Sequence, residues 1–354
     1  MAESAVIAVD HVQGRRVLPP AFAAIDLGTN NCRLLVAAPQ GDGFRVLDSY
    51  SRIVRLGEGL HETGELSELG MERAMEALQA CAARLARRQV RNLRAIATEA
   101  CRRAANGAAF LARVRRETGL PIDTISTREE AELALESCAP LLAATPDTAP
   151  PRRALLFDIG GGSTELAWVR LDGNGRPSLI GYDSLPLGVV TLAERFGTHG
   201  YDPDGFDAMV DEVADRLARF EAIHCIGHEI RDGGVTLLGT SGTVTTLAGI
   251  ALDLPRYRRL LVDGQVLTRQ AANAALGRLR ALGRAGLSEH PCIGPDRADF
   301  VLPGCAVFAA LVRLWPAERV VVADRGLREG MLLRMIRADR ERPYGRPPPR
   351  ARRA

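Results

Sequence analysis

Two short glycine-containing turns, each preceded by an aspartate and flanked by apolar runs, carry the residues best suited to chemistry in this chain. The first turn reads DLGTN and contains Asp26, and the second reads DIGGGST and contains Asp158. Glycines in a tight turn let backbone N–H groups approach a ligand without interference from a Cβ, and such turns form nests for anions. An aspartate at the end of a strand can hold a magnesium ion or its waters against phosphate oxygens. The two turns therefore predict a site for phosphate groups and Mg²⁺.

The same two turns occupy equivalent places in a repeated pattern. With an offset of 132 residues, Asp26 falls on Asp158, Gly28 on Gly160 and Leu34 on Leu166. Either turn alone is explained equally well as an ordinary β-hairpin, but the matched placement predicts an internal duplication. Two similar domains would then face each other across a cleft with a phosphate-binding turn on each wall. The candidate phosphate-binding residues are Gly28, Thr29, Asn30, Gly160, Gly161, Gly162, Ser163 and Thr164.

A third turn, in the segment LGTSGTVTTLAG (238–249), follows a predicted strand and opens a predicted helix. The free N–H groups of such a helix start can face an anion, which makes Ser241 and Gly242 further candidates for phosphate binding. An ordinary N-cap formed by Ser241 or Thr243 explains the same residues equally well.

The composition excludes several classes of protein. Of the 354 residues, 46% are hydrophobic and 25% charged, as in soluble globular proteins. All 46 basic residues are arginine, so a phosphate-loop lysine, a kinase strand lysine and a lysine Schiff base are all excluded. None of the seven cysteines forms a C-x-x-C pair, and no second cluster completes a zinc site around His224, Cys225 and His228.

Charge and hydropathy point to a protein of the cytoplasm that needs neither nucleic acid nor membrane. The formal charge is +3, but residues 334–354 alone carry +6, so the rest of the chain sums to −3 and does not form a basic body for nucleic acid. No stretch approaches the ~18 apolar residues of a membrane span, and the first residues lack the pattern of a secretory signal.

Hydrophobic periodicity and the placement of turn residues predict alternating strands and helices in the rest of the chain. We expect helices at about 69–88, from near Glu99, at 207–221 and at 327–337, and strands at 94–98, 235–241 and 319–324. A proline-rich break at 145–153 separates the two halves of the chain.

Nine short motifs follow one another along the chain from about residue 22 to 337. They are IDLGTN (25–30), RLGEGL (55–60), ATEACRRAAN (97–106), ISTREEA (125–131), DIGGGSTEL (158–166), SLPLG (184–188), GTSGTVTTLAG (239–249), RADFVLPG (297–304) and DRGLREG (324–330). In type and order this set resembles the exopolyphosphatase and guanosine pentaphosphate phosphohydrolase family.

The resemblance implies an α/β fold of duplicated ribonuclease-H-like domains, actin-like (ASKHA) in type, with mixed sheets and an interdomain cleft. On that basis the chain divides into a leader (1–19), a first domain (20–127 with 327–340), a second domain (128–326) and a basic tail (341–354). The cleft would hydrolyse terminal phosphoryl groups with Mg²⁺ as cofactor.

The resemblance also implies roles for individual residues. Glu130 matches the general base that deprotonates the attacking water, and Arg102 matches an arginine that clamps phosphate oxygens. Asp158, Glu165 and Asp26 are the candidate ligands of the metal or of its waters. From the residues alone, the favoured interpretation of Glu130 is an exposed acid in the first turn of a helix, and the alternative for Arg102 is a surface arginine beside Arg103.

Two positions depart from the family pattern, and one domain is missing. Asn31 stands where the family has serine, and Thr127 stands where it has glycine, which stiffens the backbone near the expected hinge. Longer members append a histidine-aspartate type helical domain. The present chain has no His-Asp dipeptide and corresponds to a short form.

We therefore expect an exopolyphosphatase that cleaves inorganic polyphosphate. The alternative within the same reaction class is a guanosine pentaphosphate 5′-phosphohydrolase, and the alternative from another class is an actin-like nucleotide-binding switch. A kinase of the same fold is disfavoured because no carbohydrate-binding signature is present. The sequence leaves open whether the protein forms a homodimer.

The choice of polyphosphate depends on charge. Arg52, Arg55, Arg128 and the basic tail would grip an extended phosphate chain, with strong salt dependence. A nucleotide would need a base pocket, and no stacking aromatic is found beside the GTSGTVTTLAG turn.

Overall fold

The structure is a computed structural model that describes residues 20–143, 153–173 and 176–341. The predicted leader, most of the proline-rich break and nearly all of the basic tail lie outside the described residues. None of the described helices combines the length and the apolar character needed to cross a lipid bilayer.

The first half of the chain forms a five-stranded mixed sheet in the order β3-β2-β1-β4-β5. β1 is the central strand. It pairs antiparallel with β2 on one side and parallel with β4 on the other. Helices α2 (Glu68–Ala86) and α4 (Gly107–Thr118) pack on one face of the sheet and close the first hydrophobic core. The strands are β1 (Ala21–Leu27), β2 (Asn31–Gln40), β3 (Gly43–Ile53), β4 (Val90–Ala97) and β5 (Ile122–Thr124), and two short helices, α1 (Leu60–Thr63) and α3 (Glu99–Arg103), follow β3 and β4.

The second half repeats this order and adds one edge strand. Its sheet runs β10-β11-β9-β6-β7-β8, so that β8-β7-β6-β9-β11 corresponds strand by strand to β3-β2-β1-β4-β5. The strands are β6 (Arg153–Ile159), β7 (Thr164–Leu171), β8 (Pro177–Leu185), β9 (Val235–Thr240), β10 (Val266–Thr268) and β11 (Arg319–Ala323).

Helices of the second half build the largest core on one face of that sheet. Trp315, Phe157 and Phe308 are among its fully buried side chains. The helices are α6 (Val189–Phe196), the 3₁₀ helix η1 (Gly197–Tyr201), α7 (Pro203–His224), α8 (Ile226–Arg231), α9 (Gly242–Ala251), α10 (Arg259–Val262), α11 (Arg269–Glu289) and α12 (Pro295–Leu314).

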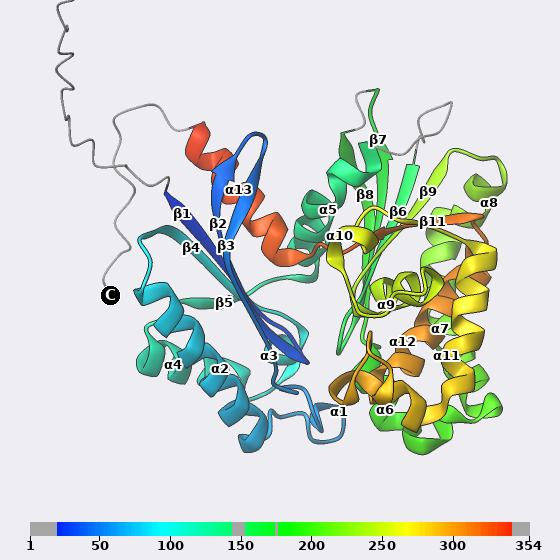
Figure 1. Ribbon diagram of the computed structural model, residues 1–354, viewed down its shortest axis with the longest axis horizontal. Coiled ribbons are helices and arrows are strands. Elements are labelled where there is room, and N and C mark those ends of the chain that lie inside the picture. Colours follow the sequence, from blue (N-terminus) through cyan, green and yellow to red (C-terminus); the bar gives the residue numbers. More distant parts are fainter. Residues whose placement is uncertain (1–19, 144–152, 174–175, 342–354) are drawn as a thin grey trace, which may run out of the picture.

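Two long helices lie side by side between the two sheets (Figure 1). α5 (Thr127–Ala143) packs on the second sheet, and α13 (Leu327–Arg340) packs on β1 and β2 of the first sheet. A Cβ on Gly330 would meet the Leu133 carbonyl oxygen at 2.2 Å, so a glycine is required where the two helix backbones approach each other. Together with the inner faces of both sheets, these helices form a third core that joins the two halves.

The repeated strand order confirms the duplicated, actin-like α/β fold expected from the sequence. The expected elements are also confirmed within a few residues, including α2, β9, β11 and α13. The strand expected at 94–98 begins earlier, at Val90, because β4 pairs with the whole of β1, from Ala21 to Leu27. The proposed boundaries of the two domains stay a prediction.

Candidate active site

The two glycine turns have the same backbone geometry. In the first hairpin (β1–β2), the Gly28 N–H donates to the Asn31 carbonyl at 2.9 Å, and in the second hairpin (β6–β7) the Gly160 N–H donates to the Ser163 carbonyl at 2.9 Å. The N–H groups at the tips of both turns, among the described residues, donate to no backbone carbonyl. They are therefore free to bind an anion.

The two turns touch each other across the halves of the molecule. A Cβ on Gly162 would lie 2.7 Å from the Thr29 hydroxyl, and one on Gly161 would lie 3.1–3.2 Å from Thr29 and Asn30. A third glycine, Gly188, faces the carbonyl of Gly161 so closely that a Cβ there would sit at 2.4 Å. A side chain at Gly162 would therefore crowd the contact between the two turns, and one at Gly188 would collide with the backbone of the second turn.

The third turn joins them at the start of α9. Ser241 adopts a positive φ of 118°, which is strained for a residue with a side chain, and its hydroxyl accepts from the Thr243 N–H at 3.2 Å. The N-cap interpretation of Ser241 is therefore correct. Ser241 and Gly242 nevertheless also face the cavity described next.

A cavity of about 1250 Å³ lies where the three turns converge. It is lined by nearly all of the residues that the sequence singled out: Asp26, Gly28, Thr29, Asn30, Glu130, Asp158, Gly160, Gly161, Gly162, Ser163, Glu165, Ser241 and Gly242. Thr164 is the exception among the phosphate-binding candidates. It is fully buried in β7 and donates its hydroxyl to the Leu187 carbonyl at 2.8 Å, which removes it from the cavity.

Glu130 reaches the cavity from the first turn of α5. The Ser126 hydroxyl accepts a hydrogen bond from the Glu129 N–H at 3.2 Å and so caps this helix. The cap fixes the first turn of α5, which contains Glu130. Glu130 is only 6% exposed, so the interpretation of it as a solvated acid is wrong. Burial, and then the charge of Glu165, raise the pKa of Glu130 well above its ordinary value, against the opposing pull of Arg102.

Arg102 does not line the cavity as a free clamp. Its Nη1 donates to Glu130 Oε2 and to the Ile125 carbonyl, both at 3.0 Å, and its Nη2 donates to Glu99 Oε2 at 2.6 Å. Its side chain is 20% exposed, so it is not a free surface arginine either. In this state the guanidinium orients Glu130 instead of facing a phosphate.

Three further carboxylates lie in the floor of the cavity. Burial raises the pKa of Asp26, raises that of Asp158 to about 6, and, with help from the charge of Asp158, raises that of Glu165 to about 7. Ser163 and Ser184 donate to Glu165 Oε1 at 2.5 and 3.0 Å. Such crowding of buried acids favours a bound cation.

Of the arginines that line this cavity, the sequence had pointed to Arg52 and Arg55 but not to Arg33, Arg297 or Arg328. Arg33, Arg55 and Arg297 line the cavity, and none of them pairs with a carboxylate within the described ranges. Arg328 also lines it, with its nearest acid, Glu329, 4.0 Å away. Burial lowers the pKa of Arg297, and the charge of Arg33 lowers it further, so these two guanidinium groups repel each other. The signal available was the position of Arg33, opposite Asp26 in the first hairpin.

The arginines expected to grip a phosphate chain are distributed differently. Arg52 lines the cavity but is paired with Glu76 at 2.8 Å. Arg55 holds its guanidinium 5.7 Å from the centre of the Phe300 ring, which links the first half of the chain to α12. Arg128 lies outside the cavity lining and pairs with Glu132 at 2.9 Å.

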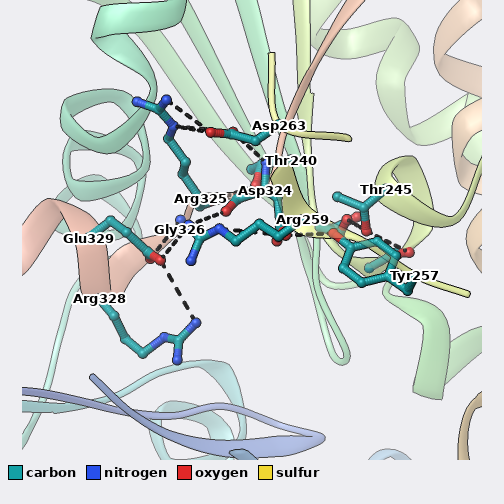
Figure 2. Close-up of polar contacts among 12 residues, drawn as sticks. Thr240, Thr245, Tyr257, Arg259, Asp263, Asp324, Arg325, Gly326, Arg328 and Glu329 are labelled. Carbon is teal, nitrogen blue, oxygen red and sulfur yellow. Dashed lines mark hydrogen bonds and ion pairs between the residues drawn. The ribbon is translucent and has the colours of Figure 1, made fainter. Parts of the chain in front are cut away.

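The far wall of the cavity is a network of polar contacts around the DRGLREG segment (Figure 2). The Tyr257 hydroxyl donates to Asp324 Oδ2 at 2.5 Å, and Arg259 donates to Glu329 Oε1 at 3.0 Å. Arg325 binds Asp263 through two N–H groups. Glu329 also accepts from the Gly326 N–H at 3.1 Å, so the first turn of α13 is tied to α10 of the second half.

The segment RLGEGL (55–60) lies against the first glycine turn, which contains Thr29 and Asn30. Its Gly57 N–H donates to the Thr29 carbonyl at 2.9 Å, and the Val54 N–H donates to the Asn30 carbonyl at 2.8 Å. The Gly59 N–H donates to Glu194 Oε1 of α6 at 2.9 Å. This loop therefore supports the first turn and also contacts the second half.

Comparison with known proteins agrees with the motifs. The model of the Ppx/GppA phosphatase family matches residues 35–339. The Ppx/GppA family member of Aquifex aeolicus, known from its crystal structure, is 27% identical, with a TM-score of 0.73 over 91% of this chain and 99% of that one. An exopolyphosphatase-like protein is 29% identical, with a TM-score of 0.78 over 89% and 97% of the two chains. An exopolyphosphatase from Cytophaga hutchinsonii shares the fold, with a TM-score of 0.78 over 90% and 98% of the chains at 24% identity.

Proposed function

This chain belongs to the Ppx/GppA phosphatase family, and from that premise we propose that it is an exopolyphosphatase, which releases the terminal phosphate of inorganic polyphosphate. One observation supports the proposal most directly. A single cavity brings together two anion-binding turns, a buried glutamate and several arginines that have no carboxylate partner among the described residues.

In this proposal Glu130 is the general base. Phosphoryl transfer to water requires an aligned nucleophile and neutralised phosphate oxygens, with little covalent assistance from the protein. A carboxylate whose pKa is raised by burial is a stronger base than an exposed one, and its pKa moves toward the operating pH. The hydrogen bond from Arg102 to Oε2 fixes the carboxylate, which leaves Oε1 to accept the proton of the attacking water.

The phosphate chain would be held by N–H groups and by guanidinium groups. The tips of the two turns offer backbone donors at the point where they meet. Arg33 and Arg297, which repel each other across the cavity, and Arg328 would each gain a charge partner when an anionic chain enters. Binding would therefore relieve an electrostatic cost that the free protein carries.

The cavity also fits Mg²⁺. The amide oxygen of Asn30 is buried and has no hydrogen-bond partner among the described residues, and it shares the cavity with Asp26, Asp158 and Glu165. Oxygen donors of this kind are the ligands that Mg²⁺ prefers. No three His, Cys, Asp or Glu side chains of the described chain form a metal-binding group on their own. Mg²⁺ is commonly held by one or two carboxylates, with substrate phosphates and water completing the shell. When bound, it would neutralise phosphate oxygens as a Lewis acid, and Asp158 with Glu165 or Asp26 would hold it.

Guanosine pentaphosphate is the second candidate, because the expectation that no aromatic lies near the third turn is wrong. Tyr257 lies beside Thr245 of that turn (Figure 2), and both Tyr257 and Phe300 line the cavity. Tyr257 comes eight residues after the end of that segment, at Gly249, and the fold brings its side chain back to the turn. An aromatic ring in a cavity lined by arginines could stack a purine.

Phosphate release from long-chain polyphosphate, short-chain polyphosphate, guanosine pentaphosphate and ATP, measured in parallel, tests the proposal. We expect kcat/KM per chain to rise with polyphosphate length and to fall steeply with salt. Equal efficiency on short and long chains, with a preference for guanosine pentaphosphate, would reverse the choice of substrate. Turnover of ATP alone would instead favour an actin-like nucleotide-binding protein.

A further inference from the structure

Glu99 is a buried acid that the proposed mechanism does not use. It is the first residue of α3, only 7% exposed, and it lies outside the cavity lining. Its Oε2 accepts from Arg102 Nη2 at 2.6 Å, while its other oxygen lies 3.7 Å from Arg103. A buried carboxylate needs a charged or hydrogen-bonded partner, and the guanidinium of Arg102 supplies it.

The spacing of these residues fixes the direction of the contact. Glu99 and Arg102 are three positions apart on one helix, so their side chains lie on the same face of α3. The guanidinium of Arg102 is planar and presents its N–H groups as a rigid fork. With Nη2 held by Glu99, only Nη1 is directed at Glu130, which it reaches from a sequence distance of 28 residues.

Glu130 therefore receives one hydrogen bond from Arg102 and not two. A free guanidinium prefers to bind a carboxylate through both of its parallel N–H groups. Such a bidentate pair would take one lone pair on each oxygen of Glu130 and set the guanidinium charge against both, so neither oxygen would be free of the cation when the proton of water is to be accepted. The third contact of Arg102, from Nη1 to the Ile125 carbonyl at 3.0 Å, would not prevent a bidentate pair with Glu130, because it uses the nitrogen that already faces Glu130 and leaves Nη2 free.

We propose that Glu99 is a positioning residue for the hydrolytic reaction, which holds Arg102 in a one-bond contact with Glu130 and so keeps the second oxygen of Glu130 available for the attacking water. This inference rests on the proposed role of Glu130 as general base. Glu99 itself touches neither the substrate nor the water. Its effect is transmitted entirely through Arg102.

The substitution Glu99→Gln tests the inference, with steady-state release of phosphate from polyphosphate as the measurement. Glutamine keeps the shape of the side chain and removes the charge that competes for Arg102. We expect kcat to fall roughly 10-fold, in the range seen when a group that orients a functional side chain is removed. KM should change by less than about twofold, because the contacts to the phosphate chain are untouched. Glu99→Ala is the second variant, since alanine is the best helix former and suits the first position of α3.

The matched control is Arg103→Ala, which removes the other arginine that approaches Glu99. It should leave kcat within about twofold of the wild type, since Arg103 is 39% exposed and makes no contact with Glu130. The second test is a double-mutant cycle. In an Arg102→Ala background, Glu99→Gln should cause no further loss of kcat, because the residue through which it acts is gone.

The outcomes separate the inference from the function on which it rests. If the wild-type protein releases no phosphate from any of the substrates, the proposed function fails. If the wild type is active and Glu99→Gln keeps its full kcat, the inference alone is overturned. A loss of the same size in the Arg102→Ala background, or a rise in KM with unchanged kcat, would also overturn it, because either result places the effect of Glu99 elsewhere.

Discussion

The two hairpins that meet at the cavity share one backbone and differ in charge. In the first hairpin Asp26 pairs across the strands with Arg33, and in the second hairpin the equivalent Asp158 pairs with Glu165. Both turns carry the same backbone hydrogen bond, at 2.9 Å in each. One hairpin therefore presents an acid with a base, and the other presents two acids.

This difference in charge gives the two sides of the cavity different electrostatic properties. Arg33 lowers the pKa values of Asp26 and Asp158, which burial raises, and it remains without an ion-pair partner among the residues described. On the other side, the charge of Asp158 adds to burial in raising the pKa of Glu165 to about 7. A duplicated backbone thus supplies N–H donors on both walls, while in the proposed function the side chains would direct anions to the Arg33 side and a cation to the side of Asp158 and Glu165.

The largest effect should come from the base that faces the acidic hairpin. Glu130→Gln keeps the shape of the side chain but cannot accept a proton, so kcat should fall by ~10²–10⁴ while the affinity for polyphosphate is retained. Phosphate release and equilibrium binding of polyphosphate measure the two quantities separately. Near-normal turnover in this variant would mean that the acidic hairpin itself, and not Glu130, activates the water.

The second comparison replaces the equivalent aspartates of the two hairpins. We expect Asp158→Asn to abolish most of the magnesium-dependent activity, by about 10²-fold, and Asp26→Asn to cost less, because Arg33 lies opposite Asp26 and opposes a cation there. Initial rates measured over a range of Mg²⁺ concentrations separate the two variants. Unchanged magnesium dependence in Asp158→Asn would place the metal on the first hairpin or outside both.

The third prediction concerns Arg33, on the side of the cavity proposed to bind the phosphate chain. Arg33→Gln should raise KM for long-chain polyphosphate by about 10-fold with little change in kcat, and should make the dependence of log KM on log salt shallower by about 1. Arg113→Gln is the control, because Arg113 is an exposed arginine of α4 bound to Glu68 and Glu117 and lies outside the cavity lining. Equal effects of the two substitutions would show that Arg33 acts only through net charge.

The smallest effect is on stability, and its sign is set by the raised pKa of Glu165. The folded protein holds a proton on Glu165 up to about pH 7, whereas the unfolded chain releases it near pH 4.5, so the stability contributed by this protonation is complete below pH 4.5 and lost as the pH rises through about 7. Glu165→Gln removes that loss. The variant should match the wild type near pH 4.5 and exceed its free energy of unfolding above pH 7 by on the order of 3 kcal/mol.

Urea unfolding in the absence of Mg²⁺, at several pH values, measures this difference. The gain should shrink when Mg²⁺ is added to the wild type, since a bound cation offsets the repulsion among the acids. A difference that stays constant between pH 4.5 and pH 8 would contradict the assignment, because the effect would then not depend on the proton of Glu165.

Much of the site could be predicted from the sequence because it depends on local backbone geometry. A tight turn such as DIGGGST places N–H groups outward wherever it occurs, and an aspartate before it stands at the strand end. Glu130, the proposed base, was singled out through its motif, and its position follows from the cap that Ser126 provides at the start of α5. Thr164 was assigned in error for a local reason too: β7 begins at this residue, and its side chain turns into the core.

The partners of the charged side chains were beyond the reach of the sequence. Arg102 was expected to bind phosphate, and in the fold it lies between Glu99 and Glu130. The reason is that an ion pair depends on distance through space, and α3 and α5 approach each other only because β4 and β5 run parallel in one sheet. Tyr257 reaches the third turn in the same way, through a contact with Asp324 from 67 residues further along the chain.

The amino-acid sequence by itself determined the two turns, their duplication and the types of residue that act on phosphate, because these follow from local conformation and from spacing along the chain. Only the tertiary structure decided that Gly162 meets Thr29, and that Arg33 and Arg297 face the cavity without an acid to pair with among the described residues. Close packing and removal from water set these properties, and both arise when segments more than a hundred residues apart are brought into contact.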